Sequence, residues 1–287
     1  MLHSSLRAWA FPTSLIGIAL VVGCRAESSA THDAQPAAAR AAHQMTIVAR
    51  NFAFDAPDTI PAGLTTLTLT NQGTEYHHAT LIRLDDGKTI ADLSTAMAEH
   101  GPPPSWITFV GGSSAPEPGR ESTITTAFEP GNYAIICFIP SSDGVPHFAK
   151  GMMKAFTVVP DPSAPTELPE ADVIVSLTDY DFTFSTPLTA GQHRILIRND
   201  GPQIHELYMA KLEPGKTLGD FLAWSETLKG PAPSTTFSGV ANLNPGHQNL
   251  VTVDVTPGDY VLICFVPDAG DGKPHFAHGM AKQITVS

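Results

Sequence analysis

The sequence predicts an all-β protein made of two tandem antiparallel β-sandwich domains with Greek-key connections, each with one short helical insertion. Three observations support this prediction. Motifs of the first half recur in the second half of the 287-residue chain, and turn-forming residues are abundant, with 25 prolines and 23 glycines. Short stretches of alternating apolar residues also end at Asn-x-Gly or Pro-Gly turns, a pattern typical of antiparallel sandwiches.

The repeat has a nearly constant offset along the chain. The clearest matches, 127 or 128 residues apart, are Asn71–Gly73 with Asn199–Gly201, Pro130–Tyr133 with Pro257–Tyr260, and Pro146–Ala149 with Pro274–Ala277. These matches predict one domain over residues 45–159 and a second over residues 172–287. The segment between them, residues 160–171, is rich in proline and is interpreted as a stiff linker.

Each copy contains several strand candidates and one helix candidate. Alternating and β-branched residues predict strands, of which the clearest are Thr65–Leu69, Ser122–Ala127, Val173–Leu177, Arg194–Arg198 and Asn249–Val255. A helix is predicted over Thr89–Glu99 in the first copy and over Thr217–Leu228 in the second. Glycine and proline follow each helix candidate and act as stop signals.

The first 23 residues have the features of an export signal. Arg7 is followed by an apolar stretch, Ala8–Val22, which is too short and interrupted for a membrane span but suits a signal peptide. The stretch ends in Val21-Val22-Gly23-Cys24, which resembles the lipobox of bacterial lipoproteins. The resemblance implies that residues 1–23 are removed and that Cys24 is acylated, which gives a stable membrane anchor. The alternative is a secretory signal with a chance cysteine.

Residues 24–44 would then be the lipidated cysteine and a flexible tether. This segment is rich in alanine, serine and polar residues and has no hydrophobic period. Arg25, rather than aspartate, follows the cysteine, and by resemblance to Gram-negative lipoproteins this favours the outer membrane. We therefore expect a lipid-anchored protein of the cell envelope that faces the periplasm or the exterior.

The chain is acidic, with a formal net charge of −12. Removal of residues 1–23 changes the charge to −13, because Arg7 is the only residue among them with a formal charge. A chain this acidic is a poor candidate for binding nucleic acid.

Two cysteines have no disulfide partner within their own domains, although thiols in an oxidising compartment normally pair. Each copy holds one such cysteine with two histidines and a methionine. The matched sets are His77, Cys137, His147 and Met152 in the first domain, and His205, Cys264, His275 and Met280 in the second. A trigonal His₂Cys site with a weak axial methionine describes a type 1 copper centre, so we expect one copper per domain and two per chain.

The same motifs space the ligands in both copies. Gly-x-Tyr-x-x-x-Cys is followed by His-x-x-x-Gly-Met, and Asn-x-x-x-x-x-His precedes both. This arrangement resembles plastocyanin and its cupredoxin relatives, and the resemblance covers most of the chain after the tether. It implies a cupredoxin fold, one-electron transfer and redox partner proteins in the envelope. We also expect His147 and His275 at the surface as electron exits, beside an apolar docking patch that includes Phe148 and Phe276.

Two positions depart from the usual cupredoxin pattern. His78 and Glu206 follow the first histidine of each set, where many relatives carry an asparagine that braces the ligand loops. Phe138 and Phe265 follow the cysteines, where small or hydroxyl residues are commoner. We expect these changes to affect the reduction potential and the geometry of the sites more than their copper occupancy.

Several alternatives remain open at this point. Cys137 and Cys264 could form a disulfide, and Met153 could replace Met152 as a ligand, although Ala281 occupies the equivalent position in the second copy. The chain could bind and deliver copper without redox traffic. It could also keep the fold and relic ligands as a metal-free interaction module.

The remaining histidines do not predict a catalytic metal site. Copper nitrite reductases and laccases need further histidines, one of them beside the cysteine. Here Ile136 and Ile263 precede the cysteines, and no His-x-His occurs in the sequence. His78, His100 and His278 are expected to be solvated, with His278 the one candidate for an extra ligand. We therefore expect that the chain is not an enzyme.

Overall fold

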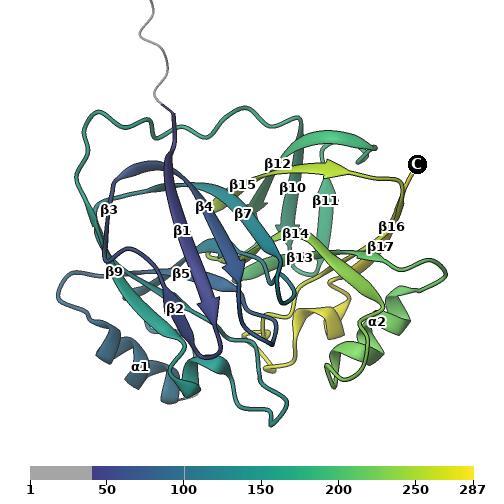
Figure 1. The fold of residues 1–287 in the computed structure, drawn as a ribbon, viewed down its shortest axis with the longest axis horizontal. Helices are drawn as coiled ribbons and strands as arrows, with labels where there is room; N and C mark the ends of the chain where they lie inside the picture. Colours follow the sequence, from purple (N-terminus) through teal and green to yellow (C-terminus); the bar gives the residue numbers. More distant parts are fainter. Residues whose placement is uncertain (1–40, 100) are drawn as a thin grey trace, which may run out of the picture. The chain divides into compact units, whose positions relative to one another are not determined.

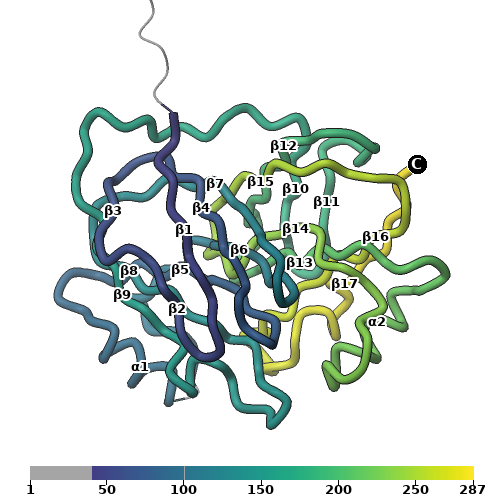
Figure 2. Tube along the Cα trace, in the orientation of Figure 1, coloured from purple at the N-terminus to yellow at the C-terminus, as the bar shows by residue number. Residues whose placement is uncertain are grey.

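The structure, a computed structural model, describes residues 41–99 and 101–287 (Figures 1 and 2). The predicted signal peptide, Cys24 and nearly all of the predicted tether lie outside the described residues, as does His100. Residues 41–287 belong to one compact unit. Among the described residues, no helix is long and apolar enough to cross a membrane.

Most of the regular structure is β-strand, and the second half repeats the strands of the first half in order, except for β3. The first half contains β1 (His43–Arg50), β2 (Ala53–Asp55), β3 (Thr59–Pro61), β4 (Gly63–Asn71), β5 (Ala79–Leu84), β6 (Ile107–Ser113), β7 (Glu121–Phe128), β8 (Gly131–Ile136) and β9 (Met153–Val159). The second half contains β10 (Val173–Thr178), β11 (Asp181–Phe184), β12 (Gly191–Asn199), β13 (His205–Leu212), β14 (Ser234–Leu243), β15 (Gln248–Val255), β16 (Gly258–Ile263) and β17 (Ala281–Val286). The all-β prediction is confirmed, and every strand predicted above lies within an observed one.

One α-helix is inserted in each half, α1 (Ile90–Ala98) and α2 (Leu218–Ser225). The Thr89 hydroxyl accepts a hydrogen bond from the Asp92 backbone N–H, and the Asp92 carboxylate accepts one from the Thr89 backbone N–H. The second helix begins with the same capping box. Such a box satisfies N–H groups that the first turn leaves free, which explains why each helix begins one residue after the threonine at which the sequence predicts its start. The second helix ends at Ser225, earlier than the predicted Leu228.

The strands form two sheets that face each other as a sandwich. One sheet has the order β11-β10-β12-β15-β7-β4-β1-β2, and the other has the order β17-β16-β13-β14-β6-β5-β8-β9-β3. Along the first half the chain changes sheet repeatedly, because β4 and β7 belong to one sheet while β5, β6 and β8 belong to the other. This crossing pattern is the predicted Greek-key arrangement, and it recurs in the second half. The sheets are not purely antiparallel as predicted, because β1 pairs with β4, β10 with β12 and β3 with β9 in parallel.

Both sheets run continuously through the two halves. Within each sheet, the halves meet at one antiparallel strand pair, β7 with β15 and β6 with β14. The paired strands occupy equivalent positions in the two copies, so the contact has the self-complementary character of a two-fold interface. Pairing covers strand edges that each half alone would expose. The sequence does not reveal this joining, because a repeat carries no signal for which edges meet.

A buried asparagine supports the junction between the halves. Asn249 is 0% exposed, and its Oδ1 accepts a hydrogen bond of 2.9 Å from the Gly112 backbone N–H. Its Nδ2 donates to the Val110 carbonyl at 3.1 Å and to Thr126 Oγ1 at 3.0 Å. Gly111 has a φ of +96°, and a Cβ there would collide with the Asn249 side chain. The close approach of the two halves therefore depends on glycine at this position.

The proline-rich segment between the halves lies against the first half along part of its length. The Leu64 backbone N–H donates to the Pro165 carbonyl at 2.6 Å. Gly63 has a φ of +107°, and a Cβ there would collide with Ala164. The segment passes along the upper edge of Figure 1. The boundaries 45–159, 160–171 and 172–287 stay predictions.

We predict that Asn249→Ala destabilises the chain by about 2–4 kcal/mol, because it leaves a buried N–H and a buried carbonyl without partners. Denaturant-induced unfolding measures the change. The exposed neighbour Gln248 provides the matched control, and Gln248→Ala should change the free energy of unfolding by less than about 0.5 kcal/mol. Equal effects of the two variants would contradict the role assigned to Asn249.

Candidate metal centres

The first predicted ligand set forms a compact cluster in the interior of the first half. Nδ1 of His147 lies 3.1 Å from Nδ1 of His77 and 3.4 Å from Sγ of Cys137. The three side chains are 0% exposed, as is Met152. The Cys137 backbone N–H donates to the Met152 carbonyl at 3.3 Å, which ties the methionine segment to the end of β8.

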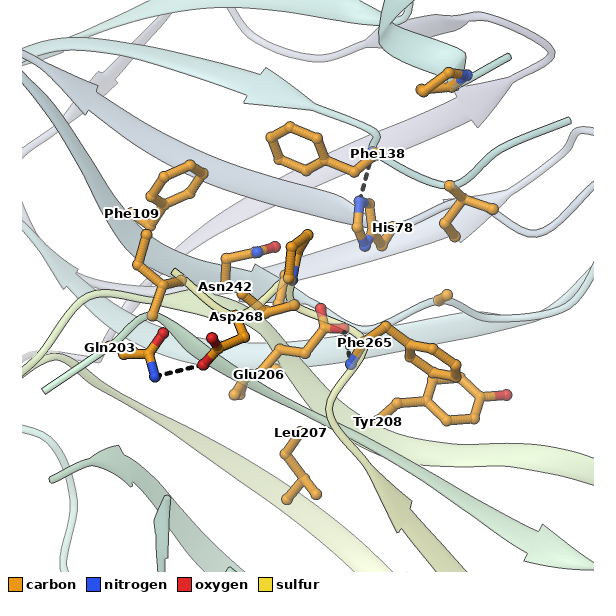
Figure 3. A pocket seen from close by; sticks show the side chains of 18 of the residues that line it. His78, Phe109, Phe138, Gln203, Glu206, Leu207, Tyr208, Asn242, Phe265 and Asp268 are labelled. Atoms are coloured by element: carbon orange, nitrogen blue, oxygen red, sulfur yellow. Dashed lines mark hydrogen bonds between the residues drawn. The ribbon is translucent and has the colours of Figure 1, made fainter. Parts of the chain in front are cut away.

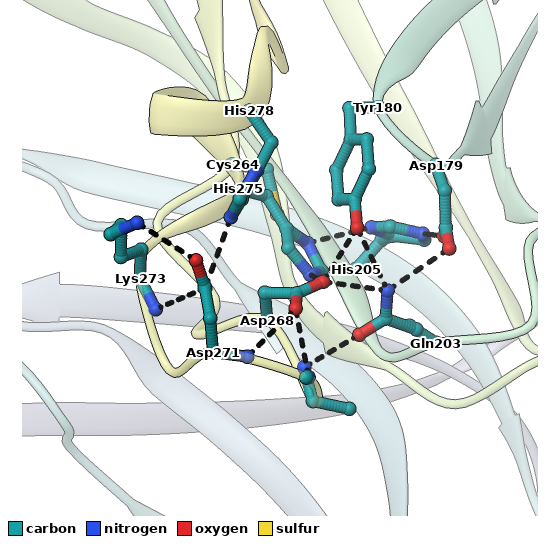
Figure 4. A network of polar contacts seen from close by, with 12 residues as sticks. Asp179, Tyr180, Gln203, His205, Cys264, Asp268, Asp271, Lys273, His275 and His278 are labelled. Atoms are coloured by element: carbon teal, nitrogen blue, oxygen red, sulfur yellow. Dashed lines mark hydrogen bonds and ion pairs between the residues drawn. The ribbon is translucent and has the colours of Figure 1, made fainter.

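The second set repeats this arrangement (Figure 4). Nδ1 of His275 lies 3.0 Å from Nδ1 of His205 and 3.4 Å from Sγ of Cys264. These residues and Met280 are also 0% exposed. The Cys264 backbone N–H donates to the Met280 carbonyl at 3.1 Å. All eight predicted metal-site residues therefore lie in two matched, buried groups.

A single turn of 3₁₀-helix explains the His-x-x-x-Gly-Met motif. The turns η1 (His147–Lys150) and η2 (His275–His278) each begin at the histidine. Gly151, with a φ of +102°, and Gly279, with a φ of +108°, end them in the left-handed conformation that glycine adopts without strain. The chain therefore reverses after the turn, and the Met152 backbone N–H donates to the His147 carbonyl at 3.0 Å. Sequence reasoning placed these residues in a loop and missed the 3₁₀ turns.

The Asn-x-Gly motif shapes the loop that delivers the first histidine. Oδ1 of the fully buried Asn71 accepts from the Gly73 backbone N–H at 2.9 Å, and its Nδ2 donates to the Glu75 carbonyl at 2.8 Å. Asn199 makes the matching bonds in the second half. A Cβ on Gly73 would collide with the His77 imidazole. The motif that revealed the repeat thus shapes the loop that carries the first histidine of each set.

Carboxylates orient one histidine in each cluster. Nε2 of His147 lies 2.7 Å from Oε2 of Glu75, and Nε2 of His205 lies 2.6 Å from Oδ1 of Asp179. A hydrogen bond from Nε2–H leaves the Nδ1 lone pair directed into the cluster, where a metal would sit. The carboxylate of the first site contacts the later histidine of its set, whereas the carboxylate of the second site contacts the earlier one. In the described residues, the ring nitrogens buried without a hydrogen-bond partner at the sites are Nε2 of His77 and Nε2 of His275.

Sequence reasoning did not find these two carboxylates. The position equivalent to Glu75 is Gln203 in the second copy, and the position equivalent to Asp179 is Asn51 in the first. The repeat therefore carries no signal for either residue. The proximity of Asp179 to its histidine depends on the packing of the turn after β10 against the ligand loops.

The donor atoms fit one copper ion in each cluster. Within each His₂Cys group, the possible ligand atoms all lie within 4.8 Å of one another. Burial lowers the pKa of His77 to about 4, and the neighbouring His147 adds to this effect, so the imidazole is neutral, as a ligand must be. Burial raises the pKa of Cys137 to about 12 and also raises that of Cys264, so metal binding has to displace a thiol proton. Two imidazoles and one thiolate beside a thioether are the donors of a type 1 copper site.

Comparison with solved structures finds copper proteins. The dithionite-reduced auracyanin of the photosynthetic bacterium Roseiflexus castenholzii is 30% identical, with 42% of this chain and 100% of that chain covered and a TM-score of 0.30. Auracyanin A of Chloroflexus aurantiacus, a "blue" copper protein, is 20% identical, with the same coverage of 42% and 100% and a TM-score of 0.31. The copper-containing nitrite reductase of Thermus scotoductus SA-01 is 16% identical, with 86% of this chain and 62% of that chain covered and a TM-score of 0.25. No family model and no curated protein matches the sequence.

The chain belongs to the cupredoxin family. This assignment rests on the 30% identity across the whole length of one auracyanin and on the two His₂Cys clusters with their buried methionines.

His78 and Glu206, which stand where many cupredoxins carry asparagine, still brace the ligand loops. Nε2 of His78 accepts a hydrogen bond of 2.7 Å from the Phe138 backbone N–H, and Oε1 of Glu206 accepts one of 3.0 Å from the Phe265 backbone N–H. Each bond holds the residue that follows the cysteine. The expectation that His78 is solvated was wrong, because its side chain packs into this brace and is only 8% exposed. Burial lowers the pKa of His78 to about 3 and raises that of Glu206 to about 7.

The expectation that the later histidine of each cupredoxin site lies at the surface was also wrong. His147 and His275 are 0% exposed. The ring of Phe52 covers His147 at a centroid distance of 5.4 Å, and the ring of Tyr180 covers His275 at 5.3 Å, each in an edge-on contact of 67°. Phe52 and Tyr180 occupy equivalent positions in the two copies. An aromatic residue from the turn after the first strand of each half therefore separates the histidine from solvent.

The positions of the sulfur residues bear on two of the alternatives. Cys137 and Cys264 are free, buried thiols, each within its own cluster, so a disulfide between them does not form. Met152 belongs to the same core cluster as Cys137, whereas Met153 packs against a different one. The preference for Met152 over Met153 agrees with this packing.

His278 lies beside the second cluster rather than in it (Figure 4). Its Nε2 contacts Oδ1 of Asp271 at 3.1 Å, and its ring packs on Tyr180 at a centroid distance of 5.0 Å. With Asp268 it forms a third group of possible metal donors. Asp268 already accepts a hydrogen bond of 2.6 Å from the Tyr180 hydroxyl, so its carboxylate serves to hold that aromatic cover.

We predict that Gly73→Ala weakens metal binding at the first site by about 10- to 100-fold, because the added methyl group displaces the His77 imidazole. Titration of the chain with Cu(II), followed by absorbance, should then show one strong site and one weak site. Gly201→Ala is the reciprocal variant, because a Cβ there would lie 2.8 Å from Nε2 of His205. Two unchanged sites in both variants, with unaltered spectra, would contradict the proposed support of these ligands.

Proposed function

We propose that this chain is a one-electron carrier with two mononuclear type 1 copper centres, anchored in the bacterial cell envelope by lipid on Cys24. The observation that carries the proposal is the recurrence, in both halves, of a buried His₂Cys cluster with a buried methionine beside it. A single buried histidine or cysteine is usually structural. Four matched donors at equivalent positions in two copies favour a common metal chemistry.

Copper held by the thiolate and two imidazoles would supply a centre that alternates between Cu(I) and Cu(II). The residues around it hold the donors in one geometry. Glu75 and Asp179 orient a histidine in each site, and the braces from His78 and Glu206 hold the segment after each cysteine. A rigid, dry site of this kind changes little between oxidation states, which favours rapid electron transfer.

Burial of the donors favours the carrier over a copper-delivery protein. In both clusters the cysteine, the histidines and the methionine are 0% exposed and belong to the sandwich interior. Release of the metal would require Phe52 or Tyr180 and the ligand loops to move away. A delivery protein needs ligands that a partner can reach, and the carrier needs only a short path for an electron.

The surroundings of the cysteines favour a carrier over an enzyme. Ile136 and Phe138 flank one cysteine, and Ile263 and Phe265 flank the other, so the flanking side chains offer no donor for a second copper. The third group of possible donors in the described part of the chain includes exposed side chains and lies beside the second site. We therefore propose redox partner proteins of the envelope, rather than a small-molecule reaction at copper, as the source and destination of electrons.

The anchoring part of the proposal rests on the lipobox-like sequence that ends at Cys24. We predict that the chain, produced in a Gram-negative host, fractionates with membranes and incorporates radiolabelled palmitate, and that Cys24→Ala removes the label. Immunoprecipitation of the chain followed by detection of the label measures this. Label that persists in Cys24→Ala would contradict lipidation at this residue.

We predict that the chain binds two copper ions and shows an intense thiolate-to-Cu(II) absorption in the visible region. Cys137→Ser and Cys264→Ser should each remove about half of the absorption and one copper, and the double variant should remove both, because the serine hydroxyl cannot replace the thiolate. Metal analysis and visible spectra measure the outcome. Met153→Leu is the control and should leave the spectrum unchanged, whereas Met152→Leu should shift it. A chain with no bound copper and no band would overturn the proposed function.

A further inference from the structure

A large cavity opens between the two halves (Figure 3). Its volume is about 1190 Å³, and residues from both halves line it. Pockets for drug-sized molecules usually measure about 300–1000 Å³, so the cavity has room for a multi-ring ligand. Phe138 and Phe265, which follow the two cysteines, both contribute to its walls.

The walls of this cavity are aromatic. Tyr76 from the first half contacts Trp224 from α2 of the second half at a ring-centroid distance of 5.7 Å. The aromatic surface continues from Trp224 to Phe221 at 5.7 Å, and from Tyr208 to Phe265 at 6.0 Å. The residues at the positions equivalent to Tyr76 and Trp224 in the other copy are Ile204 and Ala96. The contact between Tyr76 and Trp224 therefore has no counterpart at the equivalent positions of the repeat.

Two polar side chains face this apolar space without full hydrogen bonding. His78 and Glu206 are each 8% exposed and line the cavity. Because Nε2 of His78 accepts from a backbone N–H, the ring proton lies on Nδ1. Oε1 of Glu206 is used in the same way, so Oε2 remains free. Within the described residues, neither Nδ1 of His78 nor Oε2 of Glu206 has a hydrogen-bond partner. Figure 3 shows the two side chains directed toward the same space from the two halves.

We propose that the cavity between the halves binds a planar aromatic small molecule that carries hydroxyl groups. Its rings would pack against Trp224 and Tyr76, where offset or edge-on contacts between aromatic groups are favourable. One hydroxyl would donate to Oε2 of Glu206, and another hydroxyl oxygen would accept from Nδ1–H of His78. A ligand of this class pairs with two polar atoms of the cavity wall that have no hydrogen-bond partner among the described residues, which an apolar hydrocarbon or a protein side chain without hydroxyl groups does not do.

The position of this site relates it to both metal centres. A bound ligand would touch Phe138 and Phe265, each joined by one peptide bond to a cysteine of a cluster. It would also contact His78 and Glu206, each joined to the first histidine of a cluster. A ligand in the cavity would therefore contact residues next to metal-site residues of both halves. The binding itself needs no metal and does not depend on the proposed electron transfer.

Calorimetric titration of the full chain without added copper tests the proposal. The probes are 2,6-dihydroxynaphthalene, which has hydroxyl groups at opposite ends, and naphthalene, which has none. We expect saturable binding of the diol at one site per chain, with an affinity at least about tenfold higher than that of naphthalene, because the unpaired polar atoms favour the hydroxyl groups. No saturable binding of the diol, or equal affinity for the two probes, would overturn the proposal.

Variants locate the site within the cavity. Trp224→Leu should weaken diol binding by about fivefold or more through loss of the aromatic wall. Glu206→Gln keeps an oxygen for the Phe265 N–H but replaces the free carboxylate oxygen, and should also weaken binding. Trp106→Leu is the matched control, because Trp106 packs with Lys88 in the first half and does not line the cavity. Thermal unfolding identifies variants that fail to fold. Folded Trp224→Leu and Glu206→Gln variants that both bind as tightly as Trp106→Leu would overturn the assignment.

Discussion

The pairing of equivalent edge strands, β6 with β14 and β7 with β15, is the interaction on which the rest of the structure depends. It turns two sandwiches into one with continuous sheets, and it determines which loops of the two halves become neighbours. Asn249 holds the junction because it satisfies backbone groups of the opposite half, and Gly111 provides the space for its side chain. Neither half could keep the inter-domain cavity without this pairing, because the cavity walls come from both.

Each ligand cluster is held by backbone features that the two halves share and by side-chain contacts that they do not. The buried asparagine, the 3₁₀ turn and its left-handed glycine recur with the same bonds, so both clusters have the same donors in the same order. The carboxylates differ, because Glu75 holds the later histidine of the first site and Asp179 holds the earlier histidine of the second. The same metal would therefore meet a different hydrogen-bond environment in each half, and hydrogen bonds to the ligands are one means by which a protein adjusts a metal site.

The later histidine of each site lies beneath an aromatic ring rather than at the surface. In the sequence these residues stand in an exposed-looking loop, next to proline and phenylalanine, and we expected them at the surface. Phe52 and Tyr180 come from turns about 95 residues earlier in the chain and close over them in the folded molecule. A redox partner would meet these aromatic rings before the imidazoles. Phe138 and Phe265, which depart from the usual pattern, similarly gain a role as walls of the shared cavity.

The sequence by itself determined the all-β class, several of the strands, the capping threonines of both helices and the grouping of histidine, cysteine and methionine into two matched sets, because each depends on local patterns and on a motif that occurs twice. Strand alternation, the Thr-x-x-Asp capping boxes and the spacing from cysteine to histidine to methionine are all contained within short segments. Only the tertiary structure decided the joining of the sheets, the burial of His78, His147 and His275, and the choice of Glu75 and Asp179 as histidine partners. These features arise from contacts between segments far apart in the chain and differ between the copies, so neither local pattern nor repetition could predict them.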